Sequence, residues 1–105
     1  MNIVAVTACP TGIAHTYMAA AALQKAAKNL GHKIKVETQG SIGIETKITQ
    51  KEADEADLVI LAADVAIQEE GRFKNKFIYR TESQKAVKNA KGLIEEALVQ
   101  LNEKQ

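Results

Sequence analysis

The sequence predicts an α/β fold with an open, four-stranded parallel sheet, in the spatial order second, first, third, fourth (2-1-3-4), with helices on both faces. Two observations support this prediction. Four short segments with the hydrophobic pattern of a strand alternate along the chain with segments of helical periodicity, so that a helix follows each predicted strand. Such an order requires parallel strands joined by right-handed crossovers, which gives a three-layer α/β/α arrangement.

The four predicted strands differ in their hydrophobic pattern. The first and third are uninterrupted apolar runs, whereas the second and fourth alternate between polar and apolar residues. An apolar run needs cover on both faces, which places the first and third strands in the middle of the sheet and the other two at its edges. The strands are predicted at residues 3–6, 33–37, 58–63 and 76–80.

The predicted helices are marked by their end signals as well as by their periodicity. Gly31 stands where a helix C-terminus favours a residue that can adopt positive φ. Thr49 and Glu52 match a capping box. Many alanines on the inner face of the first helix would let it lie close to the sheet, whereas Gly92 costs the last helix about 1 kcal/mol relative to alanine. The helices are predicted at residues 14–30, 49–56 and 82–102, with a further turn or two of helix before Gly71.

Size and composition indicate one domain, residues 1–105, that lies in the cytoplasm. The chain is 46% hydrophobic, enough for a core, and its net charge of +1 gives no reason to expect a nucleic-acid partner. No stretch approaches the roughly 20 apolar residues of a membrane span, and the N-terminus lacks the features of a signal peptide.

The cysteine and histidine content argues against a disulfide or a metal site. The single cysteine cannot form an internal disulfide, which fits a reducing cytosol. His15 and His32 are far apart in the chain, and no second cysteine completes a set of metal ligands. We therefore expect neither a metal nor a cofactor.

The segment that leaves the first predicted strand carries the chemistry. In open parallel sheets, ligands bind beyond the carboxyl ends of the strands, where the strand order reverses, and Cys9 falls at that point, just before a helix. Only a thiolate is a good nucleophile, and a helix N-terminus favours a nearby anion by about 0.3–2 kcal/mol. The following N–H and hydroxyl groups would bind a phosphoryl group on sulfur. The predicted phosphate-binding residues are Pro10, Thr11, Gly12, Ile13, Ala14, His15 and Thr16.

Four further residues are candidates for the border of this site. Gly40 and Ser41 lie in a predicted loop, residues 40–43, which is either a plain turn or a neighbour of the site. Asp64 follows the third strand, either as the N-cap of the next helical turn or as a functional group. Arg72 either guides a partner protein or is solvated. His15 itself is either a surface imidazole or a ligand of the phosphoryl group.

Residues 6–20 read VTACPTGIAHTYMAA, which closely resembles the phosphocysteine loop of the fructose-family IIB component of the bacterial phosphoenolpyruvate-dependent sugar phosphotransferase system. The resemblance continues through VETQGSIG at residues 36–43, AADVAI at residues 62–67 and the pair Arg72-Phe73. It covers nearly the whole domain and becomes weaker after Tyr79.

The resemblance implies a function and partners. A histidine-phosphorylated IIA domain would donate a phosphoryl group to Cys9, which would pass it to a sugar, fructose or else mannose, bound to the membrane-embedded IIC domain. The chain would then be a transferase that lies at the inner face of the cell membrane, associated with or fused to IIC. The family's four-stranded parallel fold agrees with the sheet predicted above.

Three other functions compete with this reading. A cysteine-dependent phosphatase of the low-molecular-weight type has an arginine six residues after its cysteine, where this chain has His15, and an aspartate before a proline, whereas the only proline here is Pro10. A response-regulator-like module needs acidic residues after the first strand, and Thr7 and Ala8 supply none. A plain interaction module would carry Cys9 as an incidental, buried thiol.

Overall fold

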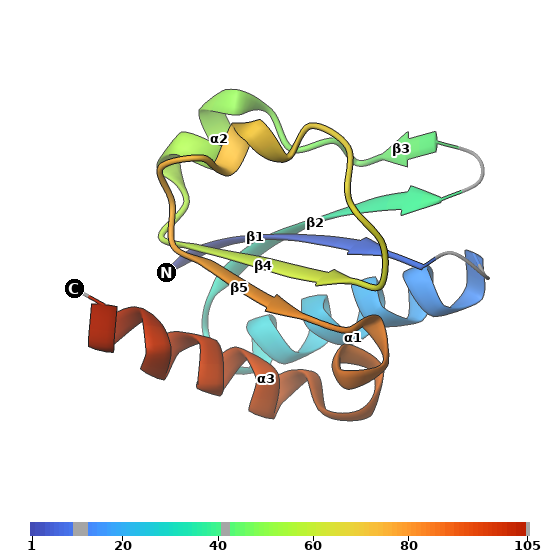
Figure 1. Cartoon of the computed structure of the whole chain (residues 1–105). Coiled ribbons are helices and arrows are strands. Elements are labelled where there is room, and N and C mark those ends of the chain that lie inside the picture. Colours follow the sequence, from blue (N-terminus) through green and yellow to red (C-terminus); the bar gives the residue numbers. More distant parts are fainter. Residues whose placement is uncertain (10–12, 41–42, 105) are drawn as a thin grey trace.

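A computed structural model describes residues 1–9, 13–40 and 43–104 of the chain. Within these residues, helices cover a mixed five-stranded sheet with the strand order β3-β2-β1-β4-β5 (Figure 1). The elements are β1 (Asn2–Ala8), α1 (Ile13–Asn29), β2 (Lys33–Gly40), β3 (Gly43–Glu45), α2 (Gln50–Glu55), β4 (Leu58–Ala63), the 3₁₀ helix η1 (Glu70–Phe73), β5 (Ile78–Thr81) and α3 (Ser83–Lys104).

The parallel part of the sheet confirms the predicted order. β1 pairs in parallel with β2 on one side and with β4 on the other, and β5 pairs in parallel with β4. The apolar strands β1 and β4 are central, as predicted from their uninterrupted hydrophobic runs. β2 extends beyond the predicted residue 37 to Gly40, and β5 begins at Ile78 rather than at residue 76.

The prediction of a four-stranded, purely parallel sheet is wrong by one strand. β3 pairs antiparallel with the end of β2, with Gly43 opposite Gly40 and Glu45 opposite Thr38. Gly40 and Gly43 therefore belong to paired strands rather than to a loop, and Ser41 lies outside the described residues. β3 has only three residues, which is too short to produce an alternating pattern in the sequence.

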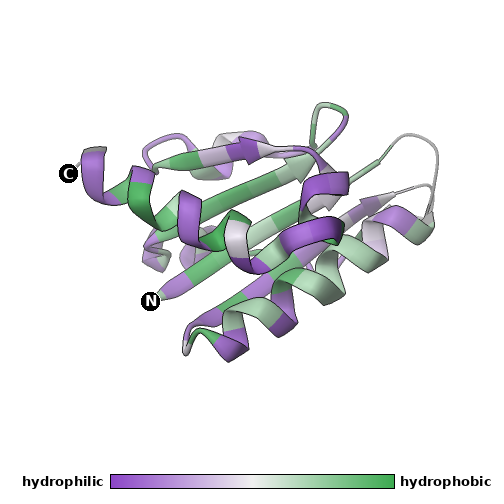
Figure 2. Ribbon diagram, turned by 90° about the horizontal axis from the view of Figure 1, so that it is seen from below, coloured by the Kyte–Doolittle hydropathy of each residue, from purple (hydrophilic) through white to green (hydrophobic). Residues whose placement is uncertain are grey.

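Helices cover both faces of the sheet, as predicted. α1 and α3 lie on one face, and α2 and η1 lie on the other (Figure 1). Seen from the α1 and α3 side, the central strands are largely apolar, whereas the two helices alternate between polar and apolar residues (Figure 2). Successive residues of a strand point to opposite faces, so each central strand supplies both cores. Ile60 of β4, for example, packs beneath α1 and α3, and its neighbour Leu61 packs on the α2 side.

Local signals in the sequence set the ends of α1 and α2. Gly31 follows α1 with a φ of +82°, and the next N–H group, that of His32, closes the helix by donating to the carbonyl of Ala27 at 2.9 Å. Thr49 and Glu52 form the predicted capping box at the start of α2. The alanine-rich face of α1 is buried against the sheet and α3, with Ala19, Leu23 and Ala27 fully inaccessible.

The two remaining helical segments depart from the prediction. The turn expected before Gly71 is a 3₁₀ helix that includes Gly71. α3 is kinked at Asn89, whose φ and ψ are −155° and 69° and whose side-chain oxygen accepts a hydrogen bond from the N–H of Gly92 at 3.1 Å. A Cβ atom at Gly92 would lie 2.5 Å from the Asn89 side chain, so the kink explains why a glycine stands inside this helix.

A buried ion pair connects β2 with η1. Both guanidinium Nη atoms of Arg72 donate to the two carboxylate oxygens of Glu37, at 2.7 and 2.9 Å, and both side chains are almost inaccessible. The N–H of Ile48 also donates a hydrogen bond to Glu37, and the carbonyl of Ile48 accepts one from Arg72. Arg72 is therefore not the surface residue that we predicted, because a carboxylate and backbone carbonyls in the interior satisfy its donors.

The surroundings of Glu37 keep it ionised. Burial by itself would raise the pKa of Glu37, but hydrogen bonds from Arg72, Gln39 and Ile48 and the positive charge of Arg72 together hold this pKa below its ordinary value of 4.5. The ionised carboxylate therefore contributes stability above pH 4.5, and this contribution is lost as the pH falls through the lower folded-state pKa.

We predict that Glu37→Gln lowers the free energy of unfolding by about 3–5 kcal/mol, because it leaves the buried Arg72 without its counter-charge. Glu52→Gln is the matched control, since Glu52 pairs with Lys35 at the surface and a glutamine can still accept the capping hydrogen bond from the N–H of Thr49, so the loss there should be much smaller. Urea denaturation of both variants measures the difference. The stability of the Glu37 variant should also fall less steeply than that of the original protein as the solution is made acidic. Equal losses in the two variants would contradict the structural role of the buried pair.

Candidate functional site

Cys9 and Asp64 lie beside each other at the carboxyl edge of the sheet. Each is the first residue after a central strand, β1 for Cys9 and β4 for Asp64, and the register pairs Ala8 with Ala63. The N–H of Asp64 also donates to the carbonyl of Ala8 at 2.9 Å. Because β1 pairs with β2 on its other side, this is the point where the strand order reverses, as predicted.

A cavity of about 500 Å³ opens at this point. Its walls come from the ends of β1 and β4, the first turn of α1 and the start of α3. Cys9 is partly exposed there and forms no disulfide, so its sulfur is within reach of a reactant. The lining residues are Cys9, His15, Ala63, Asp64, Glu82, Ser83 and Gln84.

The N-terminus of α1 lies at the same edge. α1 begins at Ile13, shortly after Cys9, and a helix leaves its first N–H groups without partners inside the helix. None of the described residues in the first turn of α1 is acidic, so the helix itself supplies no negative charge against the partial positive charge at this end. His15 projects from the first turn into the cavity. The end of α1 and His15 together favour an anion beside Cys9.

The predicted phosphate loop is only partly described. Pro10, Thr11 and Gly12 lie outside the described residues, and so does the side chain of Ile13. Ala14 is exposed on the first turn of α1. Thr16 is buried, and its carbonyl accepts a hydrogen bond from the hydroxyl of Thr7 at 3.0 Å, which ties α1 to β1.

Asp64 connects the cysteine with α3. Its carboxylate accepts hydrogen bonds from the hydroxyl of Ser83 at 2.6 Å and from the N–H of Ser83 at 3.0 Å. Partial burial opposes ionisation, but these two bonds, a hydrogen bond from the Cys9 thiol and the positive charge of His15 lower the pKa of Asp64 below its ordinary value of 3.8. Of the two roles that the sequence left open for Asp64, the cap of the next helical turn is not the one found, because Asp64 instead caps α3 from a distance and lies beside Cys9.

Two other predicted border residues lie outside the cavity wall. Gly40 follows Gln39, the register partner of Ala8, and is exposed at the same edge of the sheet. Arg72 is inside the protein with Glu37, and it is absent from the described lining of the cavity.

The sequence analysis missed the contribution of α3 to the site. Ser83, Glu82 and Gln84 line the cavity, and Ser83 is fully buried against Asp64. A serine at the start of a predicted helix is a recognisable N-terminal signal. The sequence could not show that Ser83 lies close to Cys9, because only the pairing of β4 with both β1 and β5 brings these two residues together.

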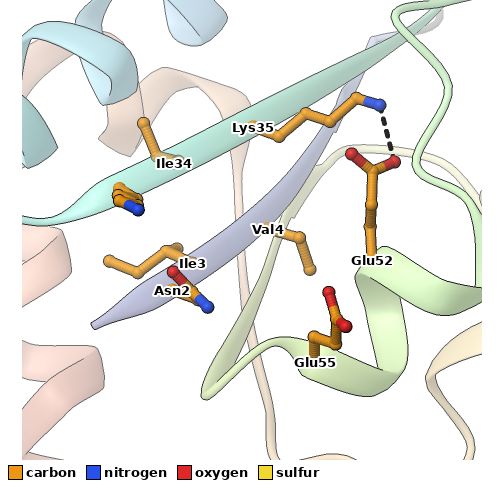
Figure 3. A pocket seen from close by; sticks show the side chains of 8 residues that line it. Asn2, Ile3, Val4, Ile34, Lys35, Glu52 and Glu55 are labelled. Atoms are coloured by element: carbon orange, nitrogen blue, oxygen red, sulfur yellow. Dashed lines mark hydrogen bonds and ion pairs between the residues drawn. The ribbon is translucent and has the colours of Figure 1, made fainter.

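A further cavity of about 210 Å³ lies at the opposite end of the strands (Figure 3). It is formed by the starts of β1 and β2 and by α2, and its charged groups include the ion pair of Lys35 with Glu52 at 2.6 Å. Ile3, Val4 and Ile34 supply apolar walls. Its described lining includes no cysteine, whereas the cavity at the other end contains Cys9 and is therefore the candidate site.

Comparisons of sequence and of structure with known proteins both point to the IIB components of sugar phosphotransferase systems. The family described as "PTS system, Lactose/Cellobiose specific IIB subunit" matches residues 4–96. The "PTS system fructose-like EIIB component 2" of Escherichia coli K12 is 53% identical over 93 residues, which are 89% of this chain and 88% of that protein. The "PTS system fructose-specific EIIABC component" of Bacillus subtilis is 50% identical over 99 residues, which are 94% of this chain but only 15% of that protein.

Two solved structures share the whole fold. A domain of a fructose-specific IIABC component from Borrelia burgdorferi superposes with a TM-score of 0.87 at 50% identity and covers 91% of each chain. The Enzyme IIB subunit of the PTS system from Escherichia coli K12 superposes with a TM-score of 0.89 at 39% identity, covering 99% of this chain and 97% of that one. The mixed sheet with helices on both faces is therefore the fold of these proteins.

Proposed function

Because this chain belongs to the IIB subunits of the bacterial phosphotransferase system, we propose that Cys9 accepts a phosphoryl group from a phosphohistidine of a IIA domain and transfers it to a sugar bound by a membrane-embedded IIC domain. The IIB components are phosphotransferases. The observation that carries the proposal is the position of Cys9, which lies at the switch point of the sheet, in an open cavity and close to the N-terminus of α1.

The transfer is an in-line displacement at phosphorus in both steps. First, the sulfur of Cys9 bonds to phosphorus while the bond from phosphorus to the donor imidazole breaks, and the imidazole keeps the electron pair and takes up a proton from solvent. Second, a sugar hydroxyl oxygen bonds to phosphorus and gives up its proton to solvent or to a base beside the sugar, and the sulfur leaves with the electron pair. The first N–H groups of α1 and the side chain of His15 stabilise the negative charge on the phosphoryl oxygens in both transition states.

The names of relatives support the choice of partners. The Bacillus subtilis relative is an EIIABC component, and a relative from Xanthomonas campestris is an EIIB'BC component, so IIB domains of this type occur in one chain with A or C domains. Within the described ranges, this chain has no helix that is long and apolar enough to cross a membrane. We propose that it works as a IIB phosphocarrier domain, residues 1–105, at the inner face of the membrane, where it meets IIC.

Fructose is the sugar that we propose, because several relatives carry the description fructose-specific or fructose-like. The matching family description names lactose and cellobiose, which supports the view that IIB domains serve different sugars. We therefore propose that the sugar is chosen by the domain that binds it.

The geometry favours a carrier over a phosphatase. A phosphatase of the low-molecular-weight type holds the phosphoryl oxygens with an arginine next to its cysteine. Here His15 occupies the corresponding place on the first turn of α1, and Arg72 is engaged with Glu37 in the interior. In the described lining of the cavity there is no arginine.

We predict that Cys9→Ser folds like the original protein but takes no phosphoryl group, because a serine hydroxyl is a far weaker nucleophile than a cysteine sulfur. The donor is the phosphorylated IIA domain of the Bacillus subtilis EIIABC relative. Intact-mass spectrometry counts the phosphoryl groups, and thermal unfolding checks the fold. A serine variant that still becomes phosphorylated would place the reaction elsewhere.

We predict that His15→Ala slows phosphorylation of Cys9 roughly 10- to 100-fold without abolishing it, the loss expected for one hydrogen bond to a charged group. His32→Ala is the matched control, because His32 lies before β2 and contacts the N-terminal amine of Met1 at 3.2 Å. Rapid-quench measurement of single-turnover transfer compares the two. Equal rates in the two variants would make His15 a bystander.

A further inference from the structure

We propose that Asp64 is the general base that takes the proton from the Cys9 thiol as the phosphoryl group arrives. This inference rests on the proposed function, because it requires that Cys9 is phosphorylated. It adds a second catalytic residue, contributed by a different strand from the one that carries the nucleophile.

The backbone brings the carboxylate to the sulfur. Ala8 and Ala63 are register partners. The hydrogen bond from the N–H of Asp64 to the carbonyl of Ala8 fixes the backbone where the chain leaves the two strands. Both side chains then line the same cavity, and a hydrogen bond with the Cys9 thiol is among the causes that lower the pKa of Asp64. A proton acceptor must lie close to the proton that it removes, and the backbone places Asp64 next to Cys9 for this role.

Ser83 holds the carboxylate in place for this role. Its hydroxyl and its N–H bind the two oxygens of Asp64, one each, and Ser83 is completely buried, so its own side chain has little freedom. The hydrogen bonds that lower the pKa of Asp64 keep it ionised at neutral pH, the state in which it can accept a proton. The carboxylate remains exposed to the cavity, so water can carry the proton away afterwards.

The proton transfer balances the first step of phosphoryl transfer. As the bond between sulfur and phosphorus forms, sulfur gives up electron density and its proton becomes strongly acidic, so even a weakly basic carboxylate removes it. The proton passes to Asp64 and then to water, while the bond between phosphorus and the donor imidazole breaks. When a sugar hydroxyl later displaces the sulfur, Cys9 leaves as a thiolate and recovers a proton from water.

Asp64→Asn tests the proposal, because it keeps the shape of the side chain and removes its basicity. We expect single-turnover phosphorylation by the phosphorylated IIA domain of the Bacillus subtilis relative to slow about 100-fold or more at pH 7. The loss should become smaller as the pH rises toward 9, because hydroxide then replaces the missing carboxylate as the proton acceptor. Cys9, His15 and Glu82, the other titratable groups that line the cavity, are present in both proteins, as is the donor.

Two variants separate proton transfer from the capping of α3. Ser83→Ala removes one hydrogen bond to Asp64 but keeps the carboxylate, so we expect less than a tenfold loss and an unchanged pH dependence. Glu95→Gln removes an exposed negative charge elsewhere on α3 and should leave the rate unchanged. If Asp64→Asn instead loses the same factor at every pH, or loses nothing, the proposal is overturned and Asp64 only caps α3.

A measurement on the unmodified protein keeps the proposal testable if Asp64→Asn does not fold. If the proton moves to Asp64 in the rate-limiting transition state, the single-turnover rate is lower in D₂O than in H₂O. A rate that is equal or higher in D₂O would mean that the thiolate forms beforehand, without Asp64, and would overturn the proposal. Both results presuppose that Cys9 takes up a phosphoryl group. An unmodified protein that takes up none would refute the proposed function instead, which keeps the two failures apart.

Discussion

The pairing of β1 with β4, in the register that sets Ala8 beside Ala63, is the constraint on which the site depends. Both strands are apolar on both faces, so a slip of one residue would exchange side chains of different size and shape between the two cores, which disfavours it. Because the strands run in the same direction, Cys9 and Asp64 have to emerge at one edge. The chain then leaves β1 toward α1 and β4 toward η1, on opposite faces, and this divergence opens the cavity (Figure 1).

The two faces of the sheet are held together by different physical means. On the side of α1 and α3 the contacts are apolar, and small alanines let the helices come close enough for their first turns to reach the site. On the other side, the segment between Asp64 and β5 contains only one short 3₁₀ helix. Hydrogen bonds of Arg72 with Glu37, and of Gln39 with the backbone of Gln68, fix that segment against β2. Buried polar groups thus take the place of regular secondary structure there.

The charges around Cys9 suit an intermediate that has to be passed on. The N-terminus of α1 and His15 attract the phosphoryl oxygens, whereas Asp64 places a carboxylate directly beside the sulfur. A site with only positive groups would hold the phosphorylated state too firmly and slow its next transfer, since only stabilisation that is greater in the transition state accelerates a reaction. The opposing charge of Asp64 limits that excess. The same hydrogen-bond network reaches α3 through Ser83, so the chemistry is coupled to the fold of the C-terminal helix.

The four parallel strands and their order, the ends of α1 and α2, and the position of Cys9 between a strand and a helix could all be predicted from the chain alone, because apolar runs, capping residues and a cysteine before a helix are local signals. The sequence did not determine β3, whose three residues are too few to show a period. It also misjudged Arg72 as a surface residue and left the role of Asp64 open. A charged side chain is solvated unless a partner meets it, and the partners, Glu37 and Ser83, stand 35 and 19 residues away in the chain. Only the tertiary structure could decide these two roles, since ion pairs and helix caps between distant segments exist only after the sheet has brought those segments together.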